Sequence, residues 1–118
     1  DAILSVPGVD ACFIGPNDLA ASMGIGLGVP LESDNPALVE AIFEIRDACK
    51  RNGGAPGIHT SGAAGANQRI EEGFQFLALA SELKYMLSGL RDDINQTNWR
   101  AANAVGIDEA VGDAGVRY

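Results

Sequence analysis

Basic residues, cysteines and aromatic residues are all scarce in this sequence. Eight lysines and arginines against sixteen acidic residues give a net charge of −8. This balance disfavours nucleic acid and anionic membrane surfaces as partners, because both attract basic proteins. No apolar run approaches the roughly 20 residues that span a bilayer, which also argues against a membrane partner. Small molecules, including anionic ones, stay open as ligands, because the local field outweighs net charge at a small site.

Only two cysteines are present, Cys12 and Cys49, and both fall at apolar positions of expected elements. We therefore expect reduced core thiols rather than a disulfide, which fits a cytoplasmic location. The chain begins at Asp1, with neither an initiator Met nor a signal-peptide pattern. We interpret it as a fragment of a longer protein.

Length and composition fit a single α/β domain at most. The chain has 118 residues, of which 47% are hydrophobic and 15 are glycine. Apolar stretches at residues 9–15, 55–60 and 74–80 alternate with helical patterns, of which the clearest begins at Asn35-Pro36. This rhythm predicts three parallel strands joined by right-handed crossovers. The unbroken apolar run of residues 11–14 predicts a strand that is buried on both faces.

The most specific motif spans residues 8–24 and reads Gly-Val-Asp-x-x-Phe-Ile-Gly-Pro-x-Asp-Leu-x-x-Ser-Met-Gly. It resembles the signature of the class II pyruvate-dependent aldolases, the HpcH/HpaI aldolase/citrate lyase family. Weaker matches follow in the same order at residues 55–58, 73–78 and 115–118. The resemblance covers essentially the whole chain, but only the C-terminal part of the family's barrel.

The resemblance implies the C-terminal portion of a TIM (β/α)8 barrel, with about three βα units like strands six to eight. A long helix would follow from about residue 83 to residue 105 and would serve a homo-oligomer as an exchanged element. Residues 1–105 would then be a partial aldolase domain, and residues 106–118 a C-terminal tail. The glycine-rich residues 24–34 are expected to form a flexible loop at the mouth of the site.

Asp18 falls on the metal-binding aspartate of the family. The implied cofactor is a divalent metal, Mg²⁺ with Mn²⁺ or Co²⁺ as alternatives, because such cations prefer carboxylate and water oxygens. In the family this metal holds pyruvate and stabilises the enolate formed when the aldol bond breaks. From spacing alone, an Asx turn or a helix cap is the more common role for such an aspartate.

The resemblance also implies residues that bind substrate. Gly15, Pro16 and Asn17 would shape the turn that faces the substrate carboxylate, although Gly-Pro also simply terminates strands. His59, the only histidine, is expected at the end of a strand on the same face. Its place is apolar in many relatives and borders the aldehyde part of the substrate, so His59 is a departure that would alter acceptor preference. A surface role for His59 stays open.

The implied function is carbon–carbon lyase chemistry, in which a 4-hydroxy-2-oxo acid is cleaved to pyruvate and an aldehyde or formed from them. The family's second metal carboxylate, its arginine and its histidine base lie upstream of this sequence. We therefore assign no catalytic residue to the chain and expect it to be inactive alone. The alternatives are a non-catalytic fragment, a pseudoenzyme, a split-barrel subunit, or an enzyme that resembles macrophomate synthase.

Overall fold

The computed structural model describes residues 1–97. The elements are, in order, β1 (Ala11–Ile14), α1 (Pro16–Ser22), α2 (Pro36–Arg51), β2 (Ala55–Thr60), α3 (Ala63–Glu71), β3 (Phe76–Leu79) and α4 (Glu82–Gln96). Two compact units contain these elements, the first being Asp1–Ala80 and the second beginning at Ser81. Helix α4 ends at Gln96 and Thr97 is extended, so the expectation of one unbroken helix to residue 105 is wrong at this point. Residues 98–105 and the tail at 106–118 fall outside the described residues.

The sheet has three parallel strands in the order β1-β2-β3, as the sequence pattern predicts. Phe13 of β1 pairs in register with Gly57 of β2, which pairs with Phe76 of β3. Parallel pairing brings the carboxyl ends of all three strands to one edge of the sheet. That edge is where sites are built in α/β proteins.

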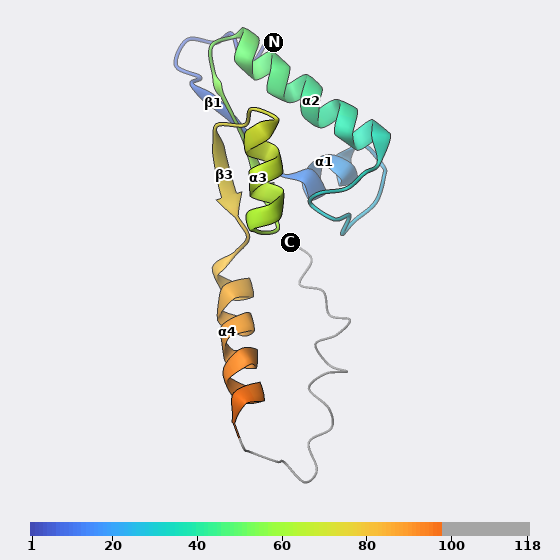
Figure 1. Cartoon of the computed structure of the whole chain (residues 1–118). Helices are drawn as coiled ribbons and strands as arrows, with labels where there is room; N and C mark the ends of the chain where they lie inside the picture. The colour runs from blue at the N-terminus through green and yellow to red at the C-terminus, as the bar shows by residue number, and fades with distance from the viewer. Residues whose placement is uncertain (98–118) are drawn as a thin grey trace. The chain divides into compact units, whose positions relative to one another are not determined.

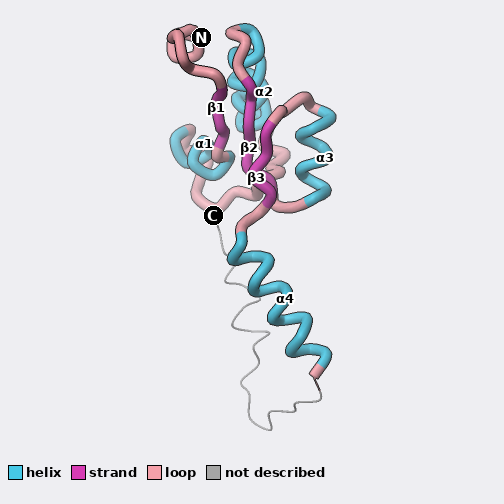
Figure 2. The backbone as a smooth tube through the Cα atoms, turned by 90° about the vertical axis from the view of Figure 1, so that its left-hand side faces the viewer, coloured by secondary structure: helices cyan, strands magenta, loops and turns pink. Residues whose placement is uncertain are grey.

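The two faces of the sheet differ. The helices α1, α2 and α3 lie on one side (Figure 1), and Figure 2 looks onto the other side, where the strands are in front. Phe13 and Phe76 lie on the open face, 49% and 42% exposed, with their ring centroids 5.4 Å apart. The prediction of a first strand buried on both faces is therefore wrong. An apolar run does not reveal whether one face or both are covered.

The core lies between the sheet and its helices. It contains Ile14, Leu38, Ile42, Ile58 and Phe74, each 4% exposed or less. Burial of a side chain of this size contributes roughly 1.5–3 kcal/mol, so these five residues make a large contribution to the stability of the first unit.

Helix α2 begins where the sequence predicts. The Asn35 side chain accepts hydrogen bonds from the backbone N–H groups of Ala37 and Leu38, at 3.1 and 3.2 Å. Pro36 follows at the first helical position, where its missing N–H costs nothing. Gly53 ends the helix with φ +77°, a conformation that other residues rarely adopt.

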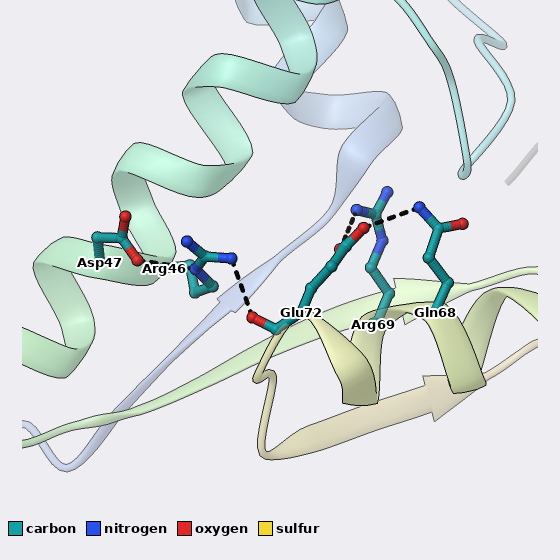
Figure 3. Close-up of polar contacts among 5 residues, drawn as sticks. All are labelled: Arg46, Asp47, Gln68, Arg69 and Glu72. Atoms are coloured by element: carbon teal, nitrogen blue, oxygen red, sulfur yellow. Dashed lines mark hydrogen bonds and ion pairs between the residues drawn. The ribbon is translucent and has the colours of Figure 1, made fainter.

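Arg46 of α2 and Arg69 of α3 both bind Glu72 at the end of α3 (Figure 3). The Arg69 side chain is 2% exposed and forms an ion pair with Glu72 at 2.7 Å. Gln68 donates to the second oxygen of the same carboxylate, and Arg46 donates to the backbone carbonyl of Glu72 at 2.9 Å. Asp47 binds the other side of Arg46 but is 47% exposed. Glu72 is therefore the centre of this network.

Helix α4 begins at Ser81, whose hydroxyl accepts a hydrogen bond from the N–H of Lys84. Its apolar side chains Met86, Leu87, Leu90 and Ile94 are exposed and recur at helical spacing. Among the described residues, no helix is both long enough and apolar enough to cross a membrane.

Candidate functional site

The carboxyl-end edge of the sheet carries the residues singled out from the sequence. Strand β1 ends at Ile14, and Gly15 precedes α1 as its N-cap residue. Pro16 is the buried first residue of α1, and Asn17 is half-buried beside it. His59 is the next-to-last residue of β2, and Ala80 directly follows β3. The three strand ends therefore supply the candidate site together.

Asp18 lies in the first turn of α1, and its side chain is exposed. The carboxylate folds back over Gly15, and its Oδ2 occupies space that a Cβ at Gly15 would take. Gly15 has φ −93° and ψ 102°, which any residue can adopt. A Cβ at Gly15 would therefore displace the Asp18 carboxylate, whereas the backbone itself would accept another residue.

A shallow hollow of about 370 Å³ adjoins this carboxylate. Its lining comes from the end of β1, from α1 and from α2: Phe13, Ile14, Gly15, Asp18, Leu19, Ser22 and Ile45. Ligand pockets start at roughly 300 Å³, so the hollow suits only a small molecule. Among the described strands β1 pairs only with β2, so its other edge is open beside this hollow.

The His59 ring points to the end of β3. Its Nε2 lies 3.1 Å from the carbonyl oxygen of Ala80. Because a carbonyl oxygen only accepts, Nε2 carries the proton, and in neutral His59 Nδ1 is then the atom with the free lone pair. The hydrogen bond therefore fixes the tautomer of the ring.

Ala80 has φ +54°, the one positive value among the described non-glycine residues. Its N–H donates to Thr60 at 2.8 Å, and its carbonyl accepts from His59. Thr60 also donates its hydroxyl to Ala78 at 3.0 Å. These bonds from the end of β2 hold a conformation that costs an L-residue about 1–2 kcal/mol. In the sequence, only the pair Ala80-Ser81 after an apolar run indicates a turn at this place. This signal is too weak to predict the positive φ of Ala80.

The register brings Asp18 and His59 to neighbouring strand ends. Gly15 follows Ile14, which pairs with Ile58, so Gly15 and His59 stand at the same level. The Asp18 carboxylate lies over Gly15, whereas His59 leans away toward Ala80. No hydrogen bond joins the two side chains in the part of the chain that the structure describes.

The donor set on this edge is small. Residues 1–97 contain no group of three His, Cys, Asp or Glu side chains that could hold a metal ion. Cys12 and Cys49 are free thiols, with Cys49 buried and Cys12 half-buried. Burial, together with a contact to Cys49, raises the pKa of Cys12 from 9.0 to about 11. Cys12 is therefore a protonated thiol at neutral pH and a poor nucleophile or ligand.

The chain consists of parallel βα units with polar residues at the carboxyl ends of the strands. This arrangement defines the class of α/β proteins whose sites lie at that edge of the sheet. The sequence profile of the HpcH/HpaI aldolase/citrate lyase family matches residues 1–89. The chain therefore belongs to the HpcH/HpaI aldolase/citrate lyase family, as its motifs indicate.

Relatives of this chain carry aldolase names. It is 38% identical over 96 residues to a hydroxypyruvate/pyruvate aldolase of Paraburkholderia phytofirmans, covering 81% of this chain and 35% of the relative. It is 39% identical over 89 residues to a 4-hydroxy-2-oxo-heptane-1,7-dioate aldolase of Salmonella paratyphi B, covering 75% and 32%. The chain thus spans about a third of the length of these relatives.

A crystal structure of a family protein from Burkholderia cenocepacia shares the fold. The TM-score is 0.70 at 33% sequence identity, and the match covers 79% of this chain and 35% of the other. The predicted fold class is confirmed: the chain is a parallel α/β unit that corresponds to part of the barrel of this family.

Proposed function

We propose that this chain supplies one cation ligand and part of the substrate pocket of a divalent-metal-dependent aldolase. The reaction is cleavage or formation of a 4-hydroxy-2-oxo acid through a pyruvate enolate. One observation carries the proposal: the Asp18 carboxylate stands exposed at the carboxyl-end edge of a parallel sheet in a chain whose named relatives are aldolases.

The donor at this edge fits a hard cation. Asp18 offers oxygen, the preferred ligand atom of Mg²⁺, Mn²⁺ and Co²⁺ sites built from one or two carboxylates plus substrate oxygens. The missing Cβ of Gly15 gives the carboxylate its place. A bound cation would act as a Lewis acid on the oxygens of a 2-oxo acid. Asp18 holds it from this chain, and any second protein ligand comes from a segment beside the open edge of β1.

Besides Asp18, which would hold the substrate through the metal, four residues are proposed to contact the substrate. Gly15, Pro16 and Asn17 form the turn that we propose faces the substrate carboxylate, as the resemblance implies. His59 faces the aldehyde part, with Nδ1 as an acceptor for a hydroxyl group. The Ala80 carbonyl supports this role, because it takes the Nε2 proton and so leaves Nδ1 able to accept.

We expect the isolated chain to be inactive, because one carboxylate binds a divalent cation weakly. A retro-aldol assay of the chain at saturating Mg²⁺ tests this, and turnover above buffer would refute it. The same donor count favours the alternative, a non-catalytic fragment or a split-barrel subunit.

We also propose a homo-oligomer through the C-terminal helix and a cytoplasmic location. The exposed apolar stripe of α4 supports the first, and the free thiols support the second. Light scattering after size exclusion tests the oligomer against an α4 variant with Met86 and Leu90 changed to Lys. A mass that both proteins share would contradict the helix-mediated contact.

The function is tested by a chimera in which this chain replaces the matching third of the Paraburkholderia aldolase. A folded chimera should release pyruvate from a 4-hydroxy-2-oxo acid when Mg²⁺ is present. Asp18→Asn should abolish this activity, whereas Asp34→Asn, an exposed acid in the loop before α2, should leave it unchanged. A folded chimera that is inactive, or one indifferent to Asp18→Asn, would overturn the proposal.

A further inference from the structure

The connection between α1 and α2 is anchored at both ends of its glycine-rich part. Ile25 and Val29 pack against the core, and the N–H of Ile25 donates to the Ala20 carbonyl at 2.9 Å. Between these anchors Leu27 is 86% exposed, with positive φ at both neighbouring glycines. The connection therefore projects a short tip and then returns to the body of the first unit.

A third anchor is polar and reaches a different strand end. Oε1 of Glu32 accepts a hydrogen bond from the backbone N–H of Ser61 at 2.8 Å, across 29 positions of sequence. Ser61 directly follows β2 and lies two residues after His59. The Glu32 carboxylate thus ties the connection after Asp18 to the turn after His59.

The start of α3 is shaped around this carboxylate. The N-cap residue of α3 is Gly62, which has no side chain to satisfy the first N–H groups of the helix. Gly65 is buried in the first turn, and a Cβ there would overlap Oε1 of Glu32. A negative charge is favoured at the N-terminal end of a helix, and the Glu32 carboxylate lies against this first turn.

We propose that Glu32 is a positioning residue that holds two of the three strand ends in one arrangement. It fixes the backbone of Ser61 and therefore the turn that follows His59. The consequence for catalysis rests on the proposed function, because that function makes this edge the substrate side. The hydrogen bond between Glu32 and Ser61, here called the tie, needs neither metal nor substrate. Gly65 belongs to the same arrangement, because its missing Cβ leaves room for the Glu32 carboxylate.

Amide hydrogen exchange of the 118-residue chain, measured by NMR in metal-free buffer, tests the tie. Glu32→Ala should speed exchange at Ser61 by about tenfold or more, since a hydrogen bond to a charged group is lost. Gly65→Ala should do the same, because the new methyl group displaces the carboxylate. Glu32→Gln keeps an acceptor oxygen and should stay within about threefold of the parent. The control Glu40→Ala removes an equal charge from the exposed face of α2 and should change nothing at Ser61.

The amide of Ile58 in the core reports global opening. It should change by less than about twofold in every variant, because the tie is local. Unchanged exchange at Ser61 in both Glu32→Ala and Gly65→Ala overturns the proposal, and so does equal acceleration at Ser61 and Ile58. If Glu32→Ala does not fold, Gly65→Ala and Glu32→Gln decide the matter by the same criteria. Since no metal is present, failure of the Asp18 proposal leaves this result untouched, and the reverse also holds.

Discussion

Replacing Glu72 by alanine tests the network of Figure 3 most severely. The change removes the partner of Arg69, whose side chain is 2% exposed, and leaves a guanidinium buried without its carboxylate. It also removes the acceptor of Gln68, but it keeps the backbone carbonyl that Arg46 binds. Nε of Arg69 already has no hydrogen-bond partner among the described residues, so little compensation is at hand.

The expected loss follows from burial. Breaking a buried ion pair on one side costs about 3–5 kcal/mol. The Glu72 side chain is 19% exposed, so some water reaches the gap, and we expect the lower end, about 3 kcal/mol. A unit of 80 residues has a total stability of roughly 4–12 kcal/mol. The loss should therefore lower the melting temperature by roughly 12–24 °C.

Guanidinium unfolding followed by far-UV circular dichroism measures the effect. The matched control is Asp47→Ala, which removes the exposed carboxylate on Arg46 and should leave the midpoint unchanged. Adding Arg69→Met to Glu72→Ala removes the orphaned charge and should recover part of the loss. Equal midpoints for Glu72→Ala and Asp47→Ala would refute the reasoning, and so would a double variant less stable than Glu72→Ala.

Three further outcomes follow from single positions. Ala80→Gly should raise the free energy of unfolding by about 0.5–1 kcal/mol, because glycine adopts φ +54° without strain. The control Ala78→Gly should lower the free energy of unfolding, and chemical denaturation compares the two variants. The pKa of the Cys12 thiol is 9.0 in the unfolded chain and about 11 in the folded one. The free energy of unfolding should therefore keep its full value below pH 9.0 and fall as the pH rises from 9.0 toward 11. Cys12→Ala should remove that fall in pH-dependent denaturation, and persistence of the fall would assign it elsewhere. Gly57→Ala should push the Phe76 ring off Phe13, costing about 1 kcal/mol and weakening the near-UV dichroism; an unchanged spectrum would contradict the close approach.

Short sequence patterns predicted much of the fold. The Asn35-Pro36 pair fixed the start of α2, and the apolar run between Gly54 and Ser61 fixed the bounds of β2. Both features depend on neighbouring residues alone. The exposed face of β1 was predicted wrongly, because coverage of a strand depends on what packs above it. The motif around Asp18 gave the family, since it survives as an ordered string of residues.

Long-range contacts could not be read from the sequence. Glu32 and Ser61 are 29 positions apart, and nothing in either neighbourhood marks the other. The same holds for His59 and the carbonyl of Ala80, 21 positions away. Each pair depends on the register of the sheet and the path of a connection, which side-chain patterns do not encode. The roles of Gly15, Pro16, Asn17, Asp18 and His59 in binding stay predictions.

The central claim is that Asp18 binds a divalent cation at the carboxyl-end edge of the sheet. Mn²⁺ binding to the chimera with the Paraburkholderia aldolase, followed by the electron paramagnetic resonance signal of the free ion, tests it most directly, because one carboxylate alone binds weakly and the chimera restores chain around β1. We predict that the chimera binds Mn²⁺, that Asp18→Asn abolishes this binding, and that Glu40→Ala leaves it unchanged. Mn²⁺ binding that persists in a folded Asp18→Asn chimera would contradict the account.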